Sequence, residues 1–278
     1  MAERRQQLST YDRELAVATT LAREAGAEVL QMQRGEFTVE LKAGDEPVTI
    51  ADRRASEMIL AGLAREFPED RVISEEVPTT ALQLVAPRLW LVDPIDGTKD
   101  FIRREDGYAV MIGLCIGGVP TVGVVYQPAL DRLFAATPAG AWVTVGDGAP
   151  EPLHVSTTAA ASDAKFVASK SHRSAAIDRV KDQLGIDNEH NVGSVGIKLC
   201  LIALGVRDLY VNPAAKTKAW DTCAPQVILA RAGGTLTDMS GVPLDYFRDL
   251  LHLRGLVASN GVVHAEVIGK LAPLVGKL

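Results

Sequence analysis

Residues 89–101 read LWLVDPIDGTKDF, and this stretch decides our interpretation of the fold. An apolar run ends in two carboxylates, Asp93 and Asp96, which flank a proline, and Gly97 and Thr98 follow directly. Carboxylates are costly to bring together unless a cation neutralises them. The stretch therefore predicts a divalent metal ion at the end of a buried strand. The competing interpretation is a plain turn between a strand and a helix.

The composition excludes several classes of protein. Of the 278 residues, 47% are apolar, enough for one large domain or for two subdomains that share a cleft. The 35 acidic and 29 basic residues give a net charge of −6, which argues against binding to nucleic-acid polymers. We find no signal peptide and no apolar run of membrane-spanning length, so we expect no membrane partner. Cys115, Cys200 and Cys223 are widely spaced and odd in number, which favours the reducing cytoplasm.

The first half of the chain has the patterns of an α+β subdomain. Apolar residues recur at helical spacing over residues 9–33 and again from residue 48 to residue 63, so both segments are predicted helices. Glycine and proline separate several strand-like segments, two of which flank residues 117–120 as an antiparallel hairpin. The predicted strands are 37–42, 71–76, 108–116, 121–126, 133–136 and 141–145.

Three acidic residues of this half deserve a second interpretation. Asp52 lies where the second helix begins, and taken alone it is best explained as an N-cap. Glu75 and Glu76 end a predicted strand, where adjacent glutamates are usually solvated. Because this pair lies shortly before Asp93 and Asp96, a shared metal site is an equally good interpretation.

The second half alternates between strands and helices, which is the pattern of an α/β layer. Turn residues gather at positions 146–152, and we place a boundary there. The predicted subdomains are therefore 1–152, with most of the metal ligands, and 153–278, with the substrate contacts and the last metal ligand. The predicted strands are 166–169, 208–211, 235–238 and 256–259, and the predicted helices are 174–184, 193–204, 220–232 and 264–277.

Candidate site residues also occur at the ends of these elements. His172 follows a strand end and has serine, lysine and arginine beside it. Gly193 and Ser194 open an apolar helix with Lys198 one turn in, an arrangement that suits an anion. Asp221 begins another helix, where it would either cap that helix or bind a metal ion.

Four motifs in their order along the chain resemble the inositol monophosphatase superfamily of lithium-sensitive, magnesium-dependent phosphatases. The resemblance implies a mixed α+β and α/β fold, a layered α-β-α-β-α sandwich of the inositol monophosphatase and sugar phosphatase type. It also implies small phosphorylated metabolites as substrates and a homodimer as the assembly. The motifs are Glu75-Glu76, Asp93-Pro94-Ile95-Asp96-Gly97-Thr98, Trp220-Asp221 and Gly233-Gly234.

The resemblance also implies roles for individual residues. Thr98 would help to activate the attacking water, with Asp52 as its proton-accepting partner. The amides of Gly97 and Thr98 would bind the phosphate, Glu76 would be an outer acid, and Lys42 would lie near the metals. The implied ligands of two or three Mg²⁺ ions are Glu75, Asp93, the carbonyl of Ile95, Asp96 and Asp221, the last of which would also lie against the substrate.

Within the superfamily, three features resemble 3'(2'),5'-bisphosphate nucleotidases: Lys99-Asp100-Phe101, the turn at residues 169–172, and residues 193–198 followed by residues 220–225. This similarity implies hydrolysis of the 3'-phosphate of adenosine 3',5'-bisphosphate to AMP and phosphate. Inositol enzymes typically carry glutamate seven residues before the Trp-Asp aspartate, where this chain has Ala214. The alternatives are an inositol 1-phosphate or fructose 1,6-bisphosphate phosphatase and, more remotely, a non-catalytic metal- or nucleotide-binding regulator. The implied nucleotide contacts are Ser169, His172, Gly193, Ser194 and Lys198.

Overall fold

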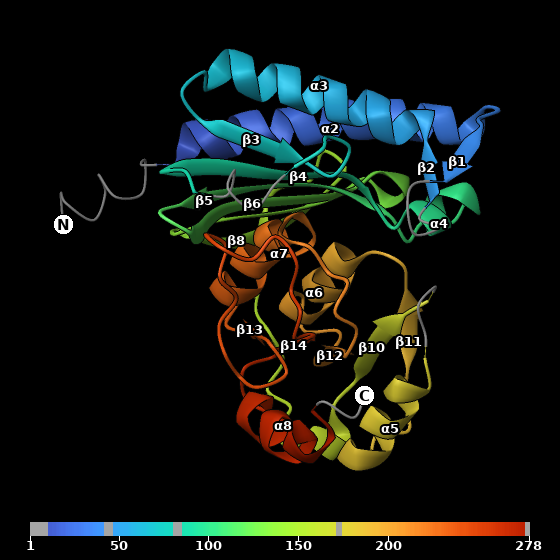
Figure 1. Cartoon of the computed structure of the whole chain (residues 1–278), viewed down its shortest axis with the longest axis vertical. Helices are drawn as coiled ribbons and strands as arrows, with labels where there is room; N and C mark the ends of the chain where they lie inside the picture. The colour runs from blue at the N-terminus through green and yellow to red at the C-terminus, as the bar shows by residue number, and fades with distance from the viewer. Residues whose placement is uncertain (1–10, 42–46, 80–84, 171–173, 276–278) are drawn as a thin grey trace.

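The computed structural model describes residues 11–41, 47–79, 85–170 and 174–275. These residues form five layers in the order helices, sheet, helices, sheet, helices (Figure 1). The layered α-β-α-β-α fold implied by the sequence is therefore confirmed. Two predicted site residues, Lys42 and His172, lie outside the described residues.

The first layer is a pair of helices, α2 (Asp12–Arg34) and α3 (Ile50–Glu66), which cover one face of the larger sheet (Figure 1). Small residues such as Ala18, Ala22 and Ala25 recur at helical spacing on the buried side of α2, so the helix packs closely on the strands. A short antiparallel pair, β1 (Val39–Leu41) and β2 (Pro47–Thr49), leads into α3.

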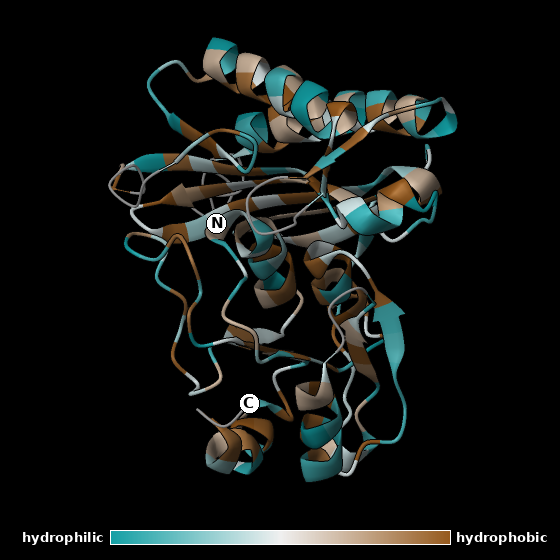
Figure 2. Cartoon of the chain, turned by 45° about the vertical axis from the view of Figure 1, so that its right-hand side comes forward, coloured by the Kyte–Doolittle hydropathy of each residue, from teal (hydrophilic) through white to brown (hydrophobic). Residues whose placement is uncertain are grey.

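The larger sheet has seven strands in the order β3-β4-β5-β6-β7-β8-β9, and only β3 and β4 pair in parallel. The predicted hairpin is present. It turns at Gly117 and Gly118, whose φ angles of 56° and 79° suit glycine in a tight hairpin turn. Hydrophobic residues fill the strands and the helices beneath them (Figure 2). The strands are β3 (Arg71–Ser74), β4 (Arg88–Asp96), β5 (Ala109–Ile116), β6 (Val119–Gln127), β7 (Arg132–Thr137), β8 (Gly140–Val145) and β9 (Glu151–Pro152).

The smaller sheet has five strands in the order β11-β10-β12-β14-β13. Strand β10 is parallel to both of its neighbours, whereas β14 is antiparallel to both of its own. The sequence missed β11, because its three residues are not an apolar or alternating run and only pairing with β10 makes them a strand. The strands are β10 (Phe166–Ser169), β11 (His190–Val192), β12 (Leu209–Asn212), β13 (Thr235–Thr237) and β14 (Leu256–Ser259).

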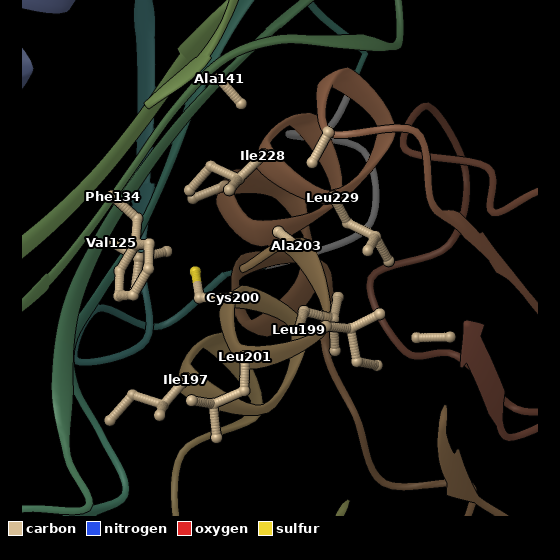
Figure 3. Packing of buried hydrophobic residues seen from close by; sticks show 14 of the residues in the cluster. Val125, Phe134, Ala141, Ile197, Leu199, Cys200, Leu201, Ala203, Ile228 and Leu229 are labelled. Atoms are coloured by element: carbon tan, nitrogen blue, oxygen red, sulfur yellow. The ribbon is translucent and has the colours of Figure 1, made fainter. Parts of the chain in front are cut away.

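The middle layer consists of α6 (Val195–Ala203) and α7 (Ala219–Arg231), which lie between the two sheets (Figure 1). Helix α6 is apolar on nearly all sides because both of its faces are covered. Figure 3 shows Val125 and Phe134 of the larger sheet beside Cys200 of α6 and Ile228 of α7. This core contains residues from both sides of the predicted boundary, and the division at 152 stays a prediction.

The last layer and the short helices complete the fold. Helices α5 (Ala175–Leu184) and α8 (His264–Leu271) cover the outer face of the smaller sheet (Figure 1). Among the described residues, no helix combines the length and the apolar character that a membrane crossing needs. The short helices are α4 (Thr98–Ile102), η2 (Pro128–Leu130), η3 (Ala161–Asp163) and η4 (Ala272–Leu274).

The three cysteines are free and buried. Two of them are distant in sequence but adjacent in space, since Cys115 of β5 and Cys223 of α7 have their Sγ atoms 3.4 Å apart. Burial raises the pKa of the Cys223 thiol, so Cys223 lacks the thiolate character that makes cysteines reactive.

Side chains of α7 take part in a buried network of hydrogen bonds. His252 Nε2 is 2.8 Å from Thr222 Oγ1, and the Tyr246 hydroxyl is 2.8 Å from the same oxygen and donates to Gln226 Oε1 at 2.7 Å. Burial lowers the pKa of His252 to about 4. The folded protein therefore holds a neutral imidazole where the unfolded chain would hold one with an ordinary pKa of about 6.5.

We expect this histidine to make the protein less stable in mild acid. Between pH values of about 4 and 6.5 the unfolded chain binds a proton that the folded protein does not, so stability is lost as the pH falls through this range. From about pH 7.5 to about pH 5, His252 should cost about 2 kcal/mol of unfolding free energy. Urea unfolding at both pH values should show a smaller acid loss for His252→Gln. Equal losses in the two proteins would contradict the assignment.

Candidate metal centre and active site

The central aspartates lie within a strand rather than after it. Strand β4 continues through Pro94 to Asp96, and its register against β5 shifts between Asp93 and Asp96. Proline has no N–H to donate to the ladder, and the Asp93 carboxylate accepts a hydrogen bond from Ile95 N at 3.0 Å. The predicted strand end is therefore a bulge, at which the regular pairing of β4 with β5 is interrupted between the two carboxylates.

Three of the predicted metal ligands gather at this bulge. Glu75, Asp93 and Asp221 each have a carboxylate oxygen within 4.8 Å of those of the other two. Glu75 directly follows β3, and its backbone N–H donates to Val92 O of the parallel neighbour β4 at 3.1 Å. Asp221 comes from the first turn of α7, and its Oδ2 accepts from Lys218 N at 2.7 Å. The cluster thus joins two strands of the larger sheet to the middle layer.

The electrostatics of this cluster favour a cation. Burial raises the pKa of Asp93 well above its ordinary range, and the charges of Glu75, Asp96 and Asp221 raise it further. Burial and the charge of Glu75 act in the same way on Asp221. The Lys218 ammonium lies 3.9 Å from Glu75 Oε1 and offsets part of this negative charge. Carboxylate oxygens are the ligands that Mg²⁺ prefers, so the residues present fit such an ion.

Asp96 has a different environment from the other three acids. Its Oδ2 accepts hydrogen bonds from Ser194 Oγ at 2.6 Å and from Gly196 N at 2.8 Å, at the N-terminus of α6. Burial raises the pKa of Asp96 to about 6, although the Lys198 charge and the Ser194 hydroxyl oppose the rise. The α6 N-terminus therefore already binds an anion, and that anion is the protein's own Asp96. A metal-binding role for Asp96 stays a prediction.

This arrangement gives Ser194 and Lys198 partners within the protein. Both side chains are fully buried, and the Lys198 ammonium donates to the carbonyls of Val192 at 3.0 Å and Gly193 at 2.7 Å. Ser194 donates to Asp96 and Lys198 donates to the preceding turn, and a contact of either side chain with a nucleotide stays a prediction. Gly193 is partly exposed, and its contact with a nucleotide stays a prediction.

The predicted catalytic pair, Thr98 and Asp52, is brought together by the fold. Thr98 Oγ1 lies 3.2 Å from Asp52 Oδ1 and 3.1 Å from the carbonyl oxygen of Ile95. The N-cap of α3 is Thr49 and not Asp52, which corrects the sequence interpretation. Asp52 closes a capping box instead, because its Oδ2 accepts from Thr49 N at 2.7 Å and from the Thr49 hydroxyl at 2.6 Å. One carboxylate oxygen therefore anchors the helix while the other faces Thr98.

Burial also changes the acidity of Asp52. It raises the pKa of Asp52 to about 6, while the two hydrogen bonds from Thr49 oppose the rise. The charges of Glu76 and Glu75 raise it slightly more, so Glu76 acts on the pair electrostatically. A carboxylate with a pKa near neutrality is suited to accept and release a proton at physiological pH.

Gly97 is needed at its position because two segments meet there. Its φ angle is 94°, and a Cβ atom would lie 2.7 Å from Gly107 O and 3.1 Å from Ser194 N. A side chain at this position would therefore collide with the backbone at Gly107 and crowd the backbone at Ser194. Phosphate binding by the amides of Gly97 and Thr98 stays a prediction.

Sequence reasoning missed the cationic part of the site. A cavity of about 380 Å³ adjoins the acidic cluster, and both Arg53 and Lys218 line it. Arg53 directly follows Asp52, and Lys218 is three residues before Asp221, so each could have been found as a basic neighbour of a predicted site acid. Ser169, at the end of β10, is partly exposed, and its substrate contact stays a prediction. The complete lining is Val48, Arg53, Glu75, Glu76, Val77, Pro78, Thr79, Lys218 and Trp220.

Comparison with known proteins defines the class to which this fold and site correspond. A model of the inositol monophosphatase family matches residues 10–275, and the chain belongs to this family. It is accordingly a metal-dependent phosphomonoesterase that acts on small phosphorylated metabolites.

Particular relatives differ in the substrates that their names give. The 3'(2'),5'-bisphosphate nucleotidase CysQ of Escherichia coli K12 is 37% identical over 234 residues, covering 81% of this chain and 91% of that protein. The histidinol-phosphatase of Mycobacterium tuberculosis is 34% identical over 240 residues, covering 85% of this chain and 88% of that protein. Among solved structures, an IMPase of Thermotoga maritima superposes with a TM-score of 0.81 at 25% identity, covering 95% of this chain and 99% of that one.

Proposed function

We propose that this protein is a Mg²⁺-dependent nucleotidase that hydrolyses the 3'-phosphate of adenosine 3',5'-bisphosphate to AMP and phosphate. The observation that carries the chemistry is the cluster of Glu75, Asp93 and Asp221 beside the Thr98–Asp52 pair. The substrate is supported by 37% identity to a 3'(2'),5'-bisphosphate nucleotidase over most of both chains.

The metal ligands in this proposal are the clustered acids together with Asp96 and the carbonyl of Ile95. Two or three bound Mg²⁺ ions would supply Lewis-acid stabilisation of the phosphate and a more acidic water molecule. The residues of the chain contribute complementary charge and geometry. The backbone N–H of Ile95 orients Asp93, and the amide of Lys218 orients Asp221.

Proton transfer in this proposal runs through Thr98. Asp52 Oδ1 accepts the hydroxyl proton of Thr98, and the threonine oxygen is then free to accept a proton from the attacking water. Thr49 keeps Asp52 in place through its backbone amide and its hydroxyl. Because water attacks the phosphate directly, no covalent intermediate on the protein is required.

An inositol or sugar phosphate is the alternative substrate class. The exposed Ala214 has no carboxylate to bind inositol hydroxyls, which disfavours inositol 1-phosphate. Similarity to a histidinol-phosphatase makes histidinol phosphate a second candidate. A non-catalytic regulator is disfavoured, because the acidic cluster and the Thr98–Asp52 pair are both complete.

A panel of phosphomonoesters tests this proposal. Phosphate release should be measured from adenosine 3',5'-bisphosphate, inositol 1-phosphate, fructose 1,6-bisphosphate and histidinol phosphate, with Mg²⁺, with EDTA and with added Li⁺. We expect kcat/KM for the bisphosphate to exceed the others by about tenfold or more, which corresponds to the net free energy of about one hydrogen bond. EDTA should abolish activity and Li⁺ should lower it. Equal or faster turnover of another substrate would reject the nucleotide assignment, and no turnover at all would favour the regulator.

Two further features belong to the proposal. We place the protein in the cytoplasm, since its three cysteines are free thiols. We also expect a homodimer, as the family resemblance implies. Light scattering of the purified protein would measure its mass in solution against the 29.7 kDa of one chain.

A further inference from the structure

Asp100 is a buried acid that the mechanism above does not use. It lies in α4, and its side chain is only 2% exposed. Its Oδ2 accepts a hydrogen bond from Gly193 N at 3.1 Å, across the junction between the two halves of the chain. Within the described part of the chain its Oδ1 has no hydrogen-bond partner, although the Arg103 guanidinium lies 3.7 Å away.

The surrounding backbone is packed closely around this carboxylate. A Cβ atom on Gly193 would lie 2.6 Å from Asp100 Cγ, and a Cβ atom on Gly107 would overlap Asp100 Oδ2. Ser194 N also donates to Gly107 O at 2.9 Å. The Gly193–Ser194 turn is therefore in contact with the loop after α4 through both Asp100 and the backbone.

The contact of Asp100 continues the one made by Asp96. Asp96 accepts from Ser194 and Gly196, while Asp100, four residues later, accepts from Gly193. Burying a carboxylate that has one oxygen without a hydrogen bond lowers the stability of the fold. An apolar residue of similar size would pack there without a desolvation cost. What the carboxylate provides is a directional acceptor for the Gly193 amide.

We propose that Asp100 is a positioning residue that fixes the Gly193–Ser194 turn relative to the bulge of β4 that carries Asp93 and Asp96. This inference deepens the proposed function and rests on it. The turn can contact the substrate only if the nucleoside part of the substrate extends from the metal-bound phosphate toward Gly193. The side chains of Ser194 and Lys198 are buried, so the turn presents the partly exposed Gly193 to such a substrate. The position of the Gly193–Ser194 turn then determines how well the nucleoside part of the substrate binds. A small aryl phosphate would not extend as far as this turn.

Three variants separate this role from general damage. Asp100→Ala removes the acceptor, Asp100→Asn keeps an oxygen for the Gly193 amide, and Asp106→Ala removes an exposed acid from the same loop as the control. Steady-state kinetics should be measured with adenosine 3',5'-bisphosphate and with 4-nitrophenyl phosphate. Hydrogen exchange of the segment 190–196 should be followed without substrate, so that the contact is tested independently of catalysis.

We expect Asp100→Ala to raise KM for the bisphosphate about tenfold, the usual cost of one lost buried hydrogen bond, and to change kcat about threefold at most. With 4-nitrophenyl phosphate, kcat/KM should stay within about twofold of the wild type. The 190–196 segment should exchange faster in this variant. Asp100→Asn should restore KM and slow exchange, and Asp106→Ala should resemble the wild type.

Equal losses on both substrates, unchanged KM for the bisphosphate, or failure of Asp100→Asn to restore it would each overturn the positioning role. Unchanged hydrogen exchange in Asp100→Ala would show that Asp100 does not fix the turn. A wild-type protein that leaves the bisphosphate intact would instead reject the proposed nucleotidase function. The exchange measurement would still decide whether Asp100 fixes the turn.

Discussion

Asp93→Asn is expected to abolish most phosphatase activity and, at the same time, to stabilise the metal-free protein. Asp93 is 2% exposed, and both burial and the neighbouring carboxylates raise its pKa. Removing its charge relieves repulsion with Glu75 and Asp221, while the amide oxygen can still accept from Ile95 N. Activity should fall by about a thousandfold or more, because a central metal ligand and one negative charge are lost.

Two measurements together make this prediction specific. Thermal unfolding in EDTA should show a higher Tm for Asp93→Asn than for the wild type, and the increase in Tm on adding Mg²⁺ should be largely lost. Asp147→Asn, at an exposed position in the turn after β8, is the matched control and should behave as the wild type in both tests. If Asp93→Asn kept its activity and its response to Mg²⁺, the metal assignment would be wrong.

Thr98→Val should lower kcat by about a hundredfold, the usual contribution of a positioned proton-transfer group. Valine has nearly the same shape, but it has no hydroxyl to donate to Asp52 Oδ1 or to accept a proton from water. KM should change little, since the side chain takes part mainly in the chemical step. Stopped-time assays of phosphate release would measure both constants.

The companion variants test whether the hydroxyl acts through Asp52. Thr98→Ser keeps the hydroxyl and should retain kcat within about tenfold of the wild type. Asp52→Asn should match the loss seen in Thr98→Val, and the double variant should lose little more than either single one, because the two residues act as one unit. Independent, additive losses would show that the pair does not share a proton.

The local structure of this protein follows closely from its sequence. Helical periodicity identified α2 and α3, and the pair Gly117–Gly118 identified the hairpin of β5 and β6. These features depend on residues that are close in the chain, where spacing and backbone preference act directly. Glu75, Asp93 and Asp221 were also identified from local sequence, because each is an acidic residue at the edge of a predicted strand or helix.

Some features could not be predicted because they depend on partners that are distant in sequence. The pairing that makes β11 a strand comes from β10, and its own residues carry no such signal. Lys198 lies one turn into a helix, where the sequence suggested an anion, yet it is fully buried and its ammonium donates to the carbonyls of Val192 and Gly193. Asp52 reads as an N-cap, whereas the fold places one of its oxygens on Thr49 and the other on Thr98.

The amino-acid sequence alone was enough to predict the kind of chemistry, because it contains several acids that suit a hard cation and a Gly-Thr pair directly after two of them. Residue type and order are enough for this, because ligand preference belongs to the side chain and not to the fold. Which carboxylates lie close together became clear from the folded structure. Asp221 joins Glu75 and Asp93, whereas Asp96 accepts hydrogen bonds from the start of α6. A side chain becomes buried, or comes close to another, when segments far apart in the chain pack together. A local sequence pattern cannot predict such contacts.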